Sequence, residues 1–146
     1  MRRVCAVIAI VGVAAVSVGL ASAATTLSYQ GYTSQGHQIT FKKTKAGVAR
    51  MAIAVRASCF DSQGVNQGDY DFALAATDAK ADRIRHGRFM TILPGNGAVP
   101  TATIKGRFNA RGVARGTINA SGPAKGPKGE DLGTCKSPTV RWTAGP

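Results

Sequence analysis

The chain has 146 residues and a formal net charge of +12, from 19 Lys and Arg against 7 Asp and Glu. This length suits one domain, and beyond the first twenty residues no apolar run reaches the about 20 residues that span a bilayer. The basic excess predicts attraction to anionic partners and does not indicate a fold.

The N-terminus has the pattern of a secretory signal peptide. Two arginines at positions 2 and 3 precede an apolar run over residues 4–20, and the small residues 21–23 suit a signal peptidase. We therefore expect residues 1–23 to be removed and the protein to be secreted or extracytoplasmic. The alternative is an uncleaved membrane anchor, for which the run is slightly short. Losing two arginines leaves 17 basic and 7 acidic residues, a charge of +10 on a single domain over residues 24–146.

Cleavage would remove Cys5 and leave two cysteines, Cys59 and Cys135. An even pair in an exported protein predicts a disulfide. Two free thiols suit an oxidising compartment poorly, and a metal would need more ligands than two distant cysteines supply. We expect a Cys59–Cys135 disulfide and no metal or cofactor.

Short alternating segments separated by turns run through the first half of the domain. Residues 26–33 form a weakly patterned first strand, and Ile39 and Phe41 share one side of a short second strand. Residues 61–69 are expected to form an exposed loop before Tyr70, Phe72 and Leu74 alternate again. In the clearest strand, apolar residues at alternate positions share one side, which we expect to face the core: Ala49, Met51, Ile53, Val55, Ala57 and Cys59.

The second half continues in the same manner. Residues 76–83 are ambiguous and are taken as a turn, and residues 83–92 predict a strand kinked at Gly87. The Gly, Pro and Lys of residues 121–133 predict a mobile surface loop, and residues 139–144 form a closing strand. Together these elements predict an all-β fold, a single-domain antiparallel β-sandwich or small barrel of about seven to nine short strands.

One cationic segment, "GRFNARGVARGTI" at residues 106–118, reads as a β-hairpin. Ile104 and Ile118 fall on the inner face if a three-residue loop at 109–111 precedes a left-handed Gly112. The glycine is then required by turn geometry and the arginines by the solvent face. The segment lacks the Gly-Lys-Ser/Thr ending of a phosphate-binding P-loop.

This register sets Lys105 across from Arg115, and shifting each strand by one position sets Arg107 across from Arg115 instead. In both registers two cations face each other, which is mildly destabilising. Either the chain tolerates this cost or an anion binds there. The candidate binding residues for an anionic partner are Lys105, Arg107, Arg111 and Arg115.

The order of "YTSQGHQITF", a strand ending in Cys59, "IRHGRF", "IKGRFNARGVARGTI", Cys135 and "VRWTA" resembles a loose group of small, uncharacterised exported bacterial all-β proteins. The similarity covers most of the mature chain. It implies a β-sandwich with one disulfide and carries over no catalytic or binding residue.

Few residues suggest catalysis. A small basic secreted nuclease would need an active site in which His37 and His86 lie close together, with Glu130 or Lys105. A Ser-His-Asp set lacks the G-x-S-x-G elbow. A calcium site would use Asp61, Asp69 and Asp71 around a Gly-rich loop. Their spacing is not that of an EF-hand.

We therefore expect a non-enzymatic, monomeric binding or structural protein whose cationic surface contacts an anionic envelope polymer, a membrane surface or an acidic protein. An inhibitor that docks through residues 61–69 or 121–133 is the alternative, and a nuclease is the third. Sequence-specific nucleic-acid binding is not expected, because single-strand binders stack bases on exposed aromatic rings. Tyr29, Tyr32 and Phe60 are the candidates for exposure, and five further aromatic residues fall on predicted core faces: Phe41, Phe72, Phe89, Phe108 and Trp142.

Overall fold

The structure, a computed structural model, describes residues 25–76 and 80–146. The predicted signal peptide and residues 77–79 of the predicted turn lie outside them. The described ranges contain nine antiparallel strands and no helix, which confirms the all-β prediction. The strands are β1 (Leu27–Thr33), β2 (Gln38–Lys43), β3 (Val48–Phe60), β4 (Asn66–Ala75), β5 (Arg88–Leu93), β6 (Thr101–Phe108), β7 (Ala114–Lys125), β8 (Asp131–Lys136) and β9 (Val140–Gly145).

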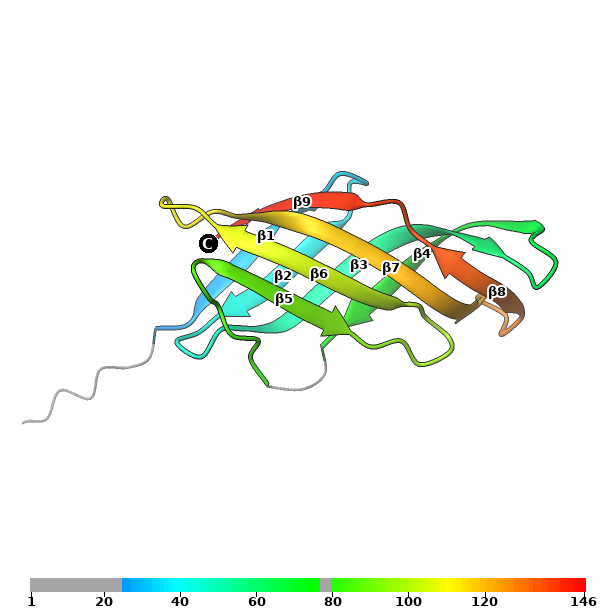
Figure 1. Ribbon diagram of the computed structural model, residues 1–146, viewed down its shortest axis with the longest axis horizontal. Coiled ribbons are helices and arrows are strands. Elements are labelled where there is room, and N and C mark those ends of the chain that lie inside the picture. The colour runs from blue at the N-terminus through cyan, green and yellow to red at the C-terminus, as the bar shows by residue number, and fades with distance from the viewer. Residues whose placement is uncertain (1–24, 77–79) are drawn as a thin grey trace, which may run out of the picture.

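All nine strands belong to one sheet that folds over on itself. The strand order is β4-β3-β2-β1-β9-β7-β6-β5, and β1 pairs with β9 where the sheet turns over. Figure 1 shows β5, β6, β7 and β9 lying in front of β1, β2, β3 and β4. We call the first group (β4-β3-β2-β1) the first layer and the second (β9-β7-β6-β5) the second layer. The free edges are β4 and β5, one on each layer.

Strand β8 links the two layers near one end of the molecule. It pairs with β3 on one side and with β7 on the other, and Cys59 of β3 lies directly across from Cys135 of β8. The two cysteines form the predicted disulfide, which is fully buried. A cross-link over 76 residues stabilises the fold by roughly 4 kcal/mol in the chain-entropy model. A buried intramolecular disulfide also indicates a non-reducing, extracytoplasmic environment.

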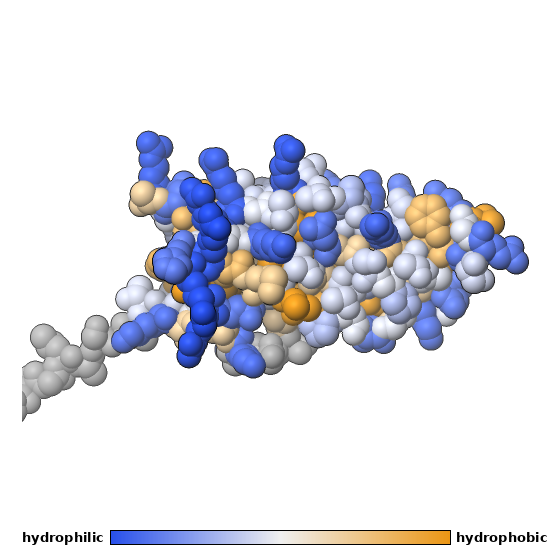
Figure 2. All heavy atoms as spheres, in the orientation of Figure 1, coloured by the Kyte–Doolittle hydropathy of each residue, from blue (hydrophilic) through white to orange (hydrophobic). Residues whose placement is uncertain are grey.

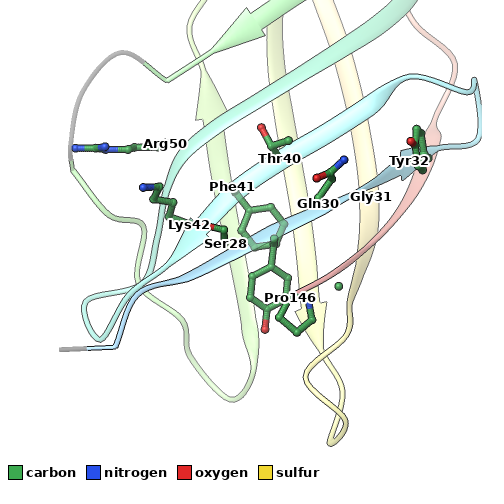
Figure 3. Close-up of a pocket in the computed structure, with 11 residues that line it drawn as sticks. Ser28, Gln30, Gly31, Tyr32, Thr40, Phe41, Lys42, Arg50 and Pro146 are labelled. Atoms are coloured by element: carbon green, nitrogen blue, oxygen red, sulfur yellow. The ribbon is translucent and has the colours of Figure 1, made fainter. Parts of the chain in front are cut away.

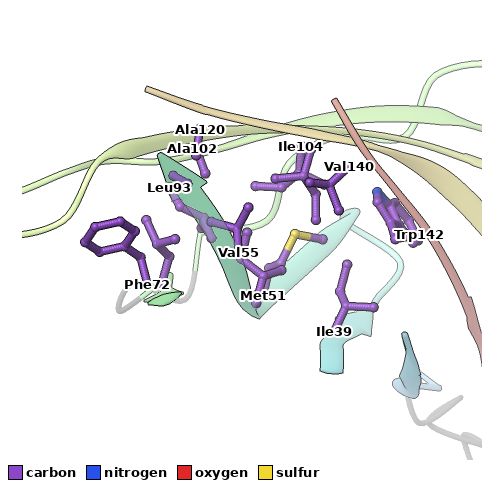
Figure 4. Close-up of a cluster of buried hydrophobic side chains, with 14 of the residues drawn as sticks. Ile39, Met51, Val55, Phe72, Leu93, Ala102, Ile104, Ala120, Val140 and Trp142 are labelled. Atoms are coloured by element: carbon purple, nitrogen blue, oxygen red, sulfur yellow. The ribbon is translucent and has the colours of Figure 1, made fainter. Parts of the chain in front are cut away.

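The core fills the space between the layers with alternate residues from each strand. The six alternate residues predicted to share the core-facing side of β3, from Ala49 to Cys59, are buried as expected. Figure 4 shows Met51 and Val55 of the first layer meeting Ile104 and Val140 of the second. Because successive side chains of a strand point to opposite faces, the residues between the buried ones lie on the outer face of the layer.

Two glycines of the second layer lie side by side under aromatic rings. Gly106 pairs with Gly116, and the flanking partners in the same row are Phe89 and Trp142. A Cβ atom on Gly106 would overlap the Phe89 ring, and one on Gly116 would overlap the carbonyl oxygen of Lys105. The glycines of the hairpin therefore make room for aromatic packing, which the sequence analysis did not foresee.

The loop of the hairpin between β6 and β7 lies one residue later than predicted, so each cross-strand partner changes by two residues. Asn109 pairs with Val113, so the three-residue loop is 110–112, and Gly112 is left-handed as predicted, with φ of 79°. The Asn109 side chain accepts hydrogen bonds from the backbone amides of Arg111 and Val113 and fixes this turn. Lys105 therefore lies across from Thr117, and Arg107 lies across from Arg115.

Three other expectations were wrong. Residues 121–133 are not one long loop: β7 extends to Lys125 and β8 begins at Asp131, with Ala124 and Leu132 buried in the core, and only residues 126–130 form a turn. Residues 66–69 belong to β4, paired with β3, so the exposed loop is shorter than 61–69. The chain does not kink at Gly87 but reverses there, in a two-residue turn with positive φ at His86 (50°) and Gly87 (73°).

Candidate functional site: a cationic sheet face

The outer face of the second layer carries basic side chains in two adjacent rows. In the first row, Arg88 of β5 lies across from Arg107 of β6, which lies across from Arg115 of β7. The second row includes Lys105 of β6 and Arg141 of β9, separated by Thr117 of β7. We call these residues the cationic face: Arg88, Lys105, Arg107, Arg115 and Arg141.

Strand alternation turns these side chains outward. Phe89 and Ile104 are buried next to Arg88 and Lys105, and Trp142 is buried next to Arg141. All five cationic side chains are exposed. Neighbouring strands lie about 4.8 Å apart, so the backbones of the three arginines in the first row span about 10 Å.

The face contains no acidic residue. The sequence has no Asp or Glu from residue 83 to residue 129, and Arg141 lies on a strand without one. Asp82, the acid nearest in sequence to Arg88, pairs through its backbone with Val48 of β3, and Glu130 and Asp131 lie in the β7–β8 hairpin. Figure 2 shows this face of the molecule, with long hydrophilic side chains gathered toward one end. Among the described residues, both ion pairs involve Asp71 of the first layer.

Two large apolar side chains lie on the same outer surface. Met90 and Ile92 alternate with Arg88 along the edge strand β5, and they are 52% and 56% exposed. Met90 is the direct cross-strand neighbour of Lys105. The surface therefore combines uncompensated positive charge with exposed hydrocarbon at its edge.

Sequence reasoning named Lys105, Arg107 and Arg115 of this face and missed two members. Arg88 and Arg141 join the face because β5 and β9 flank the β6–β7 hairpin, which a strand order alone could have revealed. Arg111, the fourth residue named from the sequence, lies at the tip of the β6–β7 turn and outside both rows.

The first layer, in contrast, has a carboxylate that an arginine and a histidine share. Both Nε and Nη2 of Arg56 donate to the carboxylate of Asp71, each at 2.9 Å, and His37 Nε2 lies 3.0 Å from the same carboxylate. The hydrogen bond from Arg56 holds the pKa of Asp71 below its ordinary value. Nearby, the Ser58 hydroxyl donates to Asp69. At the other end of β3, opposite Val48, Lys43 Nζ lies 4.6 Å from the centroid of the Phe108 ring of β6.

A shallow hollow of about 560 Å³ lies on the outer surface of the first layer. Figure 3 shows Lys42 and Arg50 at one end of the hollow and Tyr32 at the other. A β-bulge places Arg50 there with a φ of 52°. Tyr32 is 63% exposed and pairs with Thr143, the neighbour of Arg115, so this hollow borders the cationic face.

The candidate catalytic and calcium residues are not brought together. The turn containing His37 hydrogen-bonds to Arg141 near the start of β9, whereas the His86 turn contacts Phe108, which is aligned with Ala144 at the end of β9.

The three aspartates considered for calcium have separate partners. Asp61 accepts hydrogen bonds within its own loop, including from the amide of Val65, while Asp69 and Asp71 bind side chains of β3. Residues 25–76 and 80–146 contain no group of three or more His, Cys, Asp or Glu side chains arranged to hold a metal ion.

The aromatic residues are placed largely as expected. Phe41, Phe72, Phe89 and Trp142 are buried, and Phe108 is partly buried. Tyr29 is buried as well, because its hydroxyl donates to the carbonyl oxygen of Gly112 at 2.8 Å.

Protein-family models, curated protein sequences and solved structures contain no match to this chain. The resemblance to small exported all-β proteins therefore stays a prediction. Among the described residues there is no helix long and apolar enough to cross a membrane.

Proposed function

We propose that this protein is a non-enzymatic, extracytoplasmic binding protein that attaches to an anionic component of the cell envelope through the cationic face. The observation that supports this proposal most directly is the row of Arg88, Arg107 and Arg115, which has no acidic partner on its own surface. The predicted signal peptide, residues 1–23, would deliver the domain to the compartment that the buried disulfide requires.

The row carries a cost that an external anion would remove. Like charges directly across a sheet repel each other, and Arg107 has such a neighbour on both sides. Bound anions neutralise this repulsion, and guanidinium groups bind carboxylates and phosphates in bidentate geometry. On the first layer the carboxylate of Asp71 binds Arg56, whereas the three arginines in this row of the second layer have no such partner and leave charge available for a ligand.

The test is retention on an immobilised anionic polymer by a variant in which all five residues of the cationic face are replaced by Gln. The matched control also loses five positive charges, at exposed lysines elsewhere: Lys45, Lys80, Lys125, Lys128 and Lys136.

We expect the face variant to elute at much lower salt than the control variant, while both unfold at nearly the wild-type temperature. Electrostatic attachment is screened by salt, so wild-type retention should also fall steeply with ionic strength. If the two variants elute at the same salt concentration, retention reflects net charge alone and the proposed site is wrong.

A further inference from the structure

We propose that the ligand of the cationic face is the surface of an anionic lipid bilayer, and that Met90 and Ile92 enter its headgroup region. This inference rests on the proposed function and names the chemistry of its target. Three observations carry it: the position of the apolar side chains, the contrast between the two free edges, and the charge around them.

The apolar residues lie where an approaching flat surface would meet them. Arg88, Met90 and Ile92 point outward from β5, whose other face buries Phe89 and Leu93. Strand β5 ends the sheet, so it has a neighbour on one side only. A bilayer that contacts the second layer would therefore touch the cations and this edge at the same time.

The two free edges of the sheet differ in composition. The outward residues at the corresponding edge of the first layer, on β4, include Asp69 and Asp71 followed by two alanines, Ala73 and Ala75. On β5 the outward residues are one arginine and two large apolar side chains. An edge exposed only to water gains nothing from Met and Ile, which hydrate poorly, whereas small or acidic residues suit it.

The ligand chemistry follows from this combination. A hydrated anionic polymer complements the arginines but offers no hydrocarbon to Met90 and Ile92. An anionic bilayer offers both, because phosphate groups pair with Arg and Lys while apolar side chains insert beside them. Each basic residue near such a surface strengthens binding by about fivefold, and the long Arg and Lys stems allow their charged ends to reach phosphates as the edge inserts.

The experiment measures co-sedimentation with vesicles of mixed phosphatidylglycerol and phosphatidylcholine, and in parallel with beads carrying a sulfated polysaccharide. The test variant is Met90→Ser with Ile92→Ser. The matched control is Leu27→Ser with Val65→Ser, which removes two other exposed apolar side chains, 41% and 54% exposed.

We expect the test variant to lose about tenfold or more in vesicle affinity and to bind the beads like wild type, while the control variant behaves like wild type in both assays. A part of wild-type vesicle binding should also persist in high salt, because insertion is not screened.

Three outcomes would overturn the inference. Unchanged vesicle binding by the test variant would show that Met90 and Ile92 do not insert. Wild-type binding to beads without binding to vesicles would identify a polymer as the ligand and leave the proposed function standing. Failure to bind either would contradict the proposed function as well.

Discussion

The two layers of the sheet treat charge differently although they share one core. On the first layer, Arg56 and His37 share the carboxylate of Asp71, and Ser58 donates to Asp69. On the second layer, five basic side chains occupy two rows without a carboxylate among them. The two layers also differ on the side that faces the core. Ile39, Ile53 and Leu74 are cross-strand neighbours in the first layer, and Gly106 and Gly116 are cross-strand neighbours in the second.

This difference gives the two layers different expected contributions to stability and to binding. A carboxylate that pairs with neighbouring cations, as Asp71 does, stabilises its layer slightly and lowers the positive potential of that surface. A layer that leaves like charges side by side loses some stability and gains a strong surface potential. Changing one layer at a time can therefore separate stability from binding.

The largest effect should come from breaking the inner row of the second layer. Gly116→Ala places a methyl group into the carbonyl oxygen of Lys105 and within 2.8 Å of the Trp142 ring. We expect a loss of about 3 kcal/mol in the free energy of unfolding, measured by urea denaturation. Gly145→Ala is the matched control, because a Cβ atom on Gly145 meets no atom within 4 Å and its φ is not positive. Equal stability of the two variants would show that the glycine row is not close-packed.

A smaller and opposite effect should come from making the second layer resemble the first. Arg107→Glu places a carboxylate between Arg88 and Arg115 and converts two repulsive cross-strand pairs into attractive ones. We expect a gain of about 1 kcal/mol in stability together with weaker binding to anionic vesicles. Arg107→Gln should fall between wild type and Arg107→Glu in stability. A destabilised Arg107→Glu would mean that repulsion in this row is negligible.

The smallest effect should come from removing the shared carboxylate of the first layer with Asp71→Asn. The pKa of Asp71 is lowered from an ordinary value of 3.8, mainly by the hydrogen bond from Arg56. Such a carboxylate contributes its full stabilisation above pH 3.8 and loses it as the pH falls through the lowered folded-state pKa.

Wild type should therefore be slightly more stable than Asp71→Asn at pH 7, and the difference should disappear under acid. Both groups are well exposed, at 55% for Arg56 and 45% for Asp71, so the difference will be small. Urea denaturation over a pH series measures it, and vesicle binding should not change. A stability difference that persists in strong acid would contradict the role given to the Arg56–Asp71 pair.

The sequence by itself determined the strand character and the side of most strands that faces the core. Alternation is a local property, so the residue pattern alone predicts which side of β3 is buried. It also predicts that Val140 and Trp142 of β9 face the core. Composition and cysteine count likewise led to the Cys59–Cys135 disulfide. Local patterns also gave the left-handed conformation of Gly112, since a tight hairpin loop requires it.

Only the tertiary structure decided which strands are neighbours, because pairing joins residues far apart in the chain. Residues 121–133 look polar and flexible, yet pairing of β8 with β3 and β7 draws them into strands. Arg88 and Arg141 are more than fifty residues apart, and the order β9-β7-β6-β5 alone places them on one face. A two-residue change in hairpin register, which follows from moving the loop by one residue, likewise decided that Arg107 and not Lys105 faces Arg115.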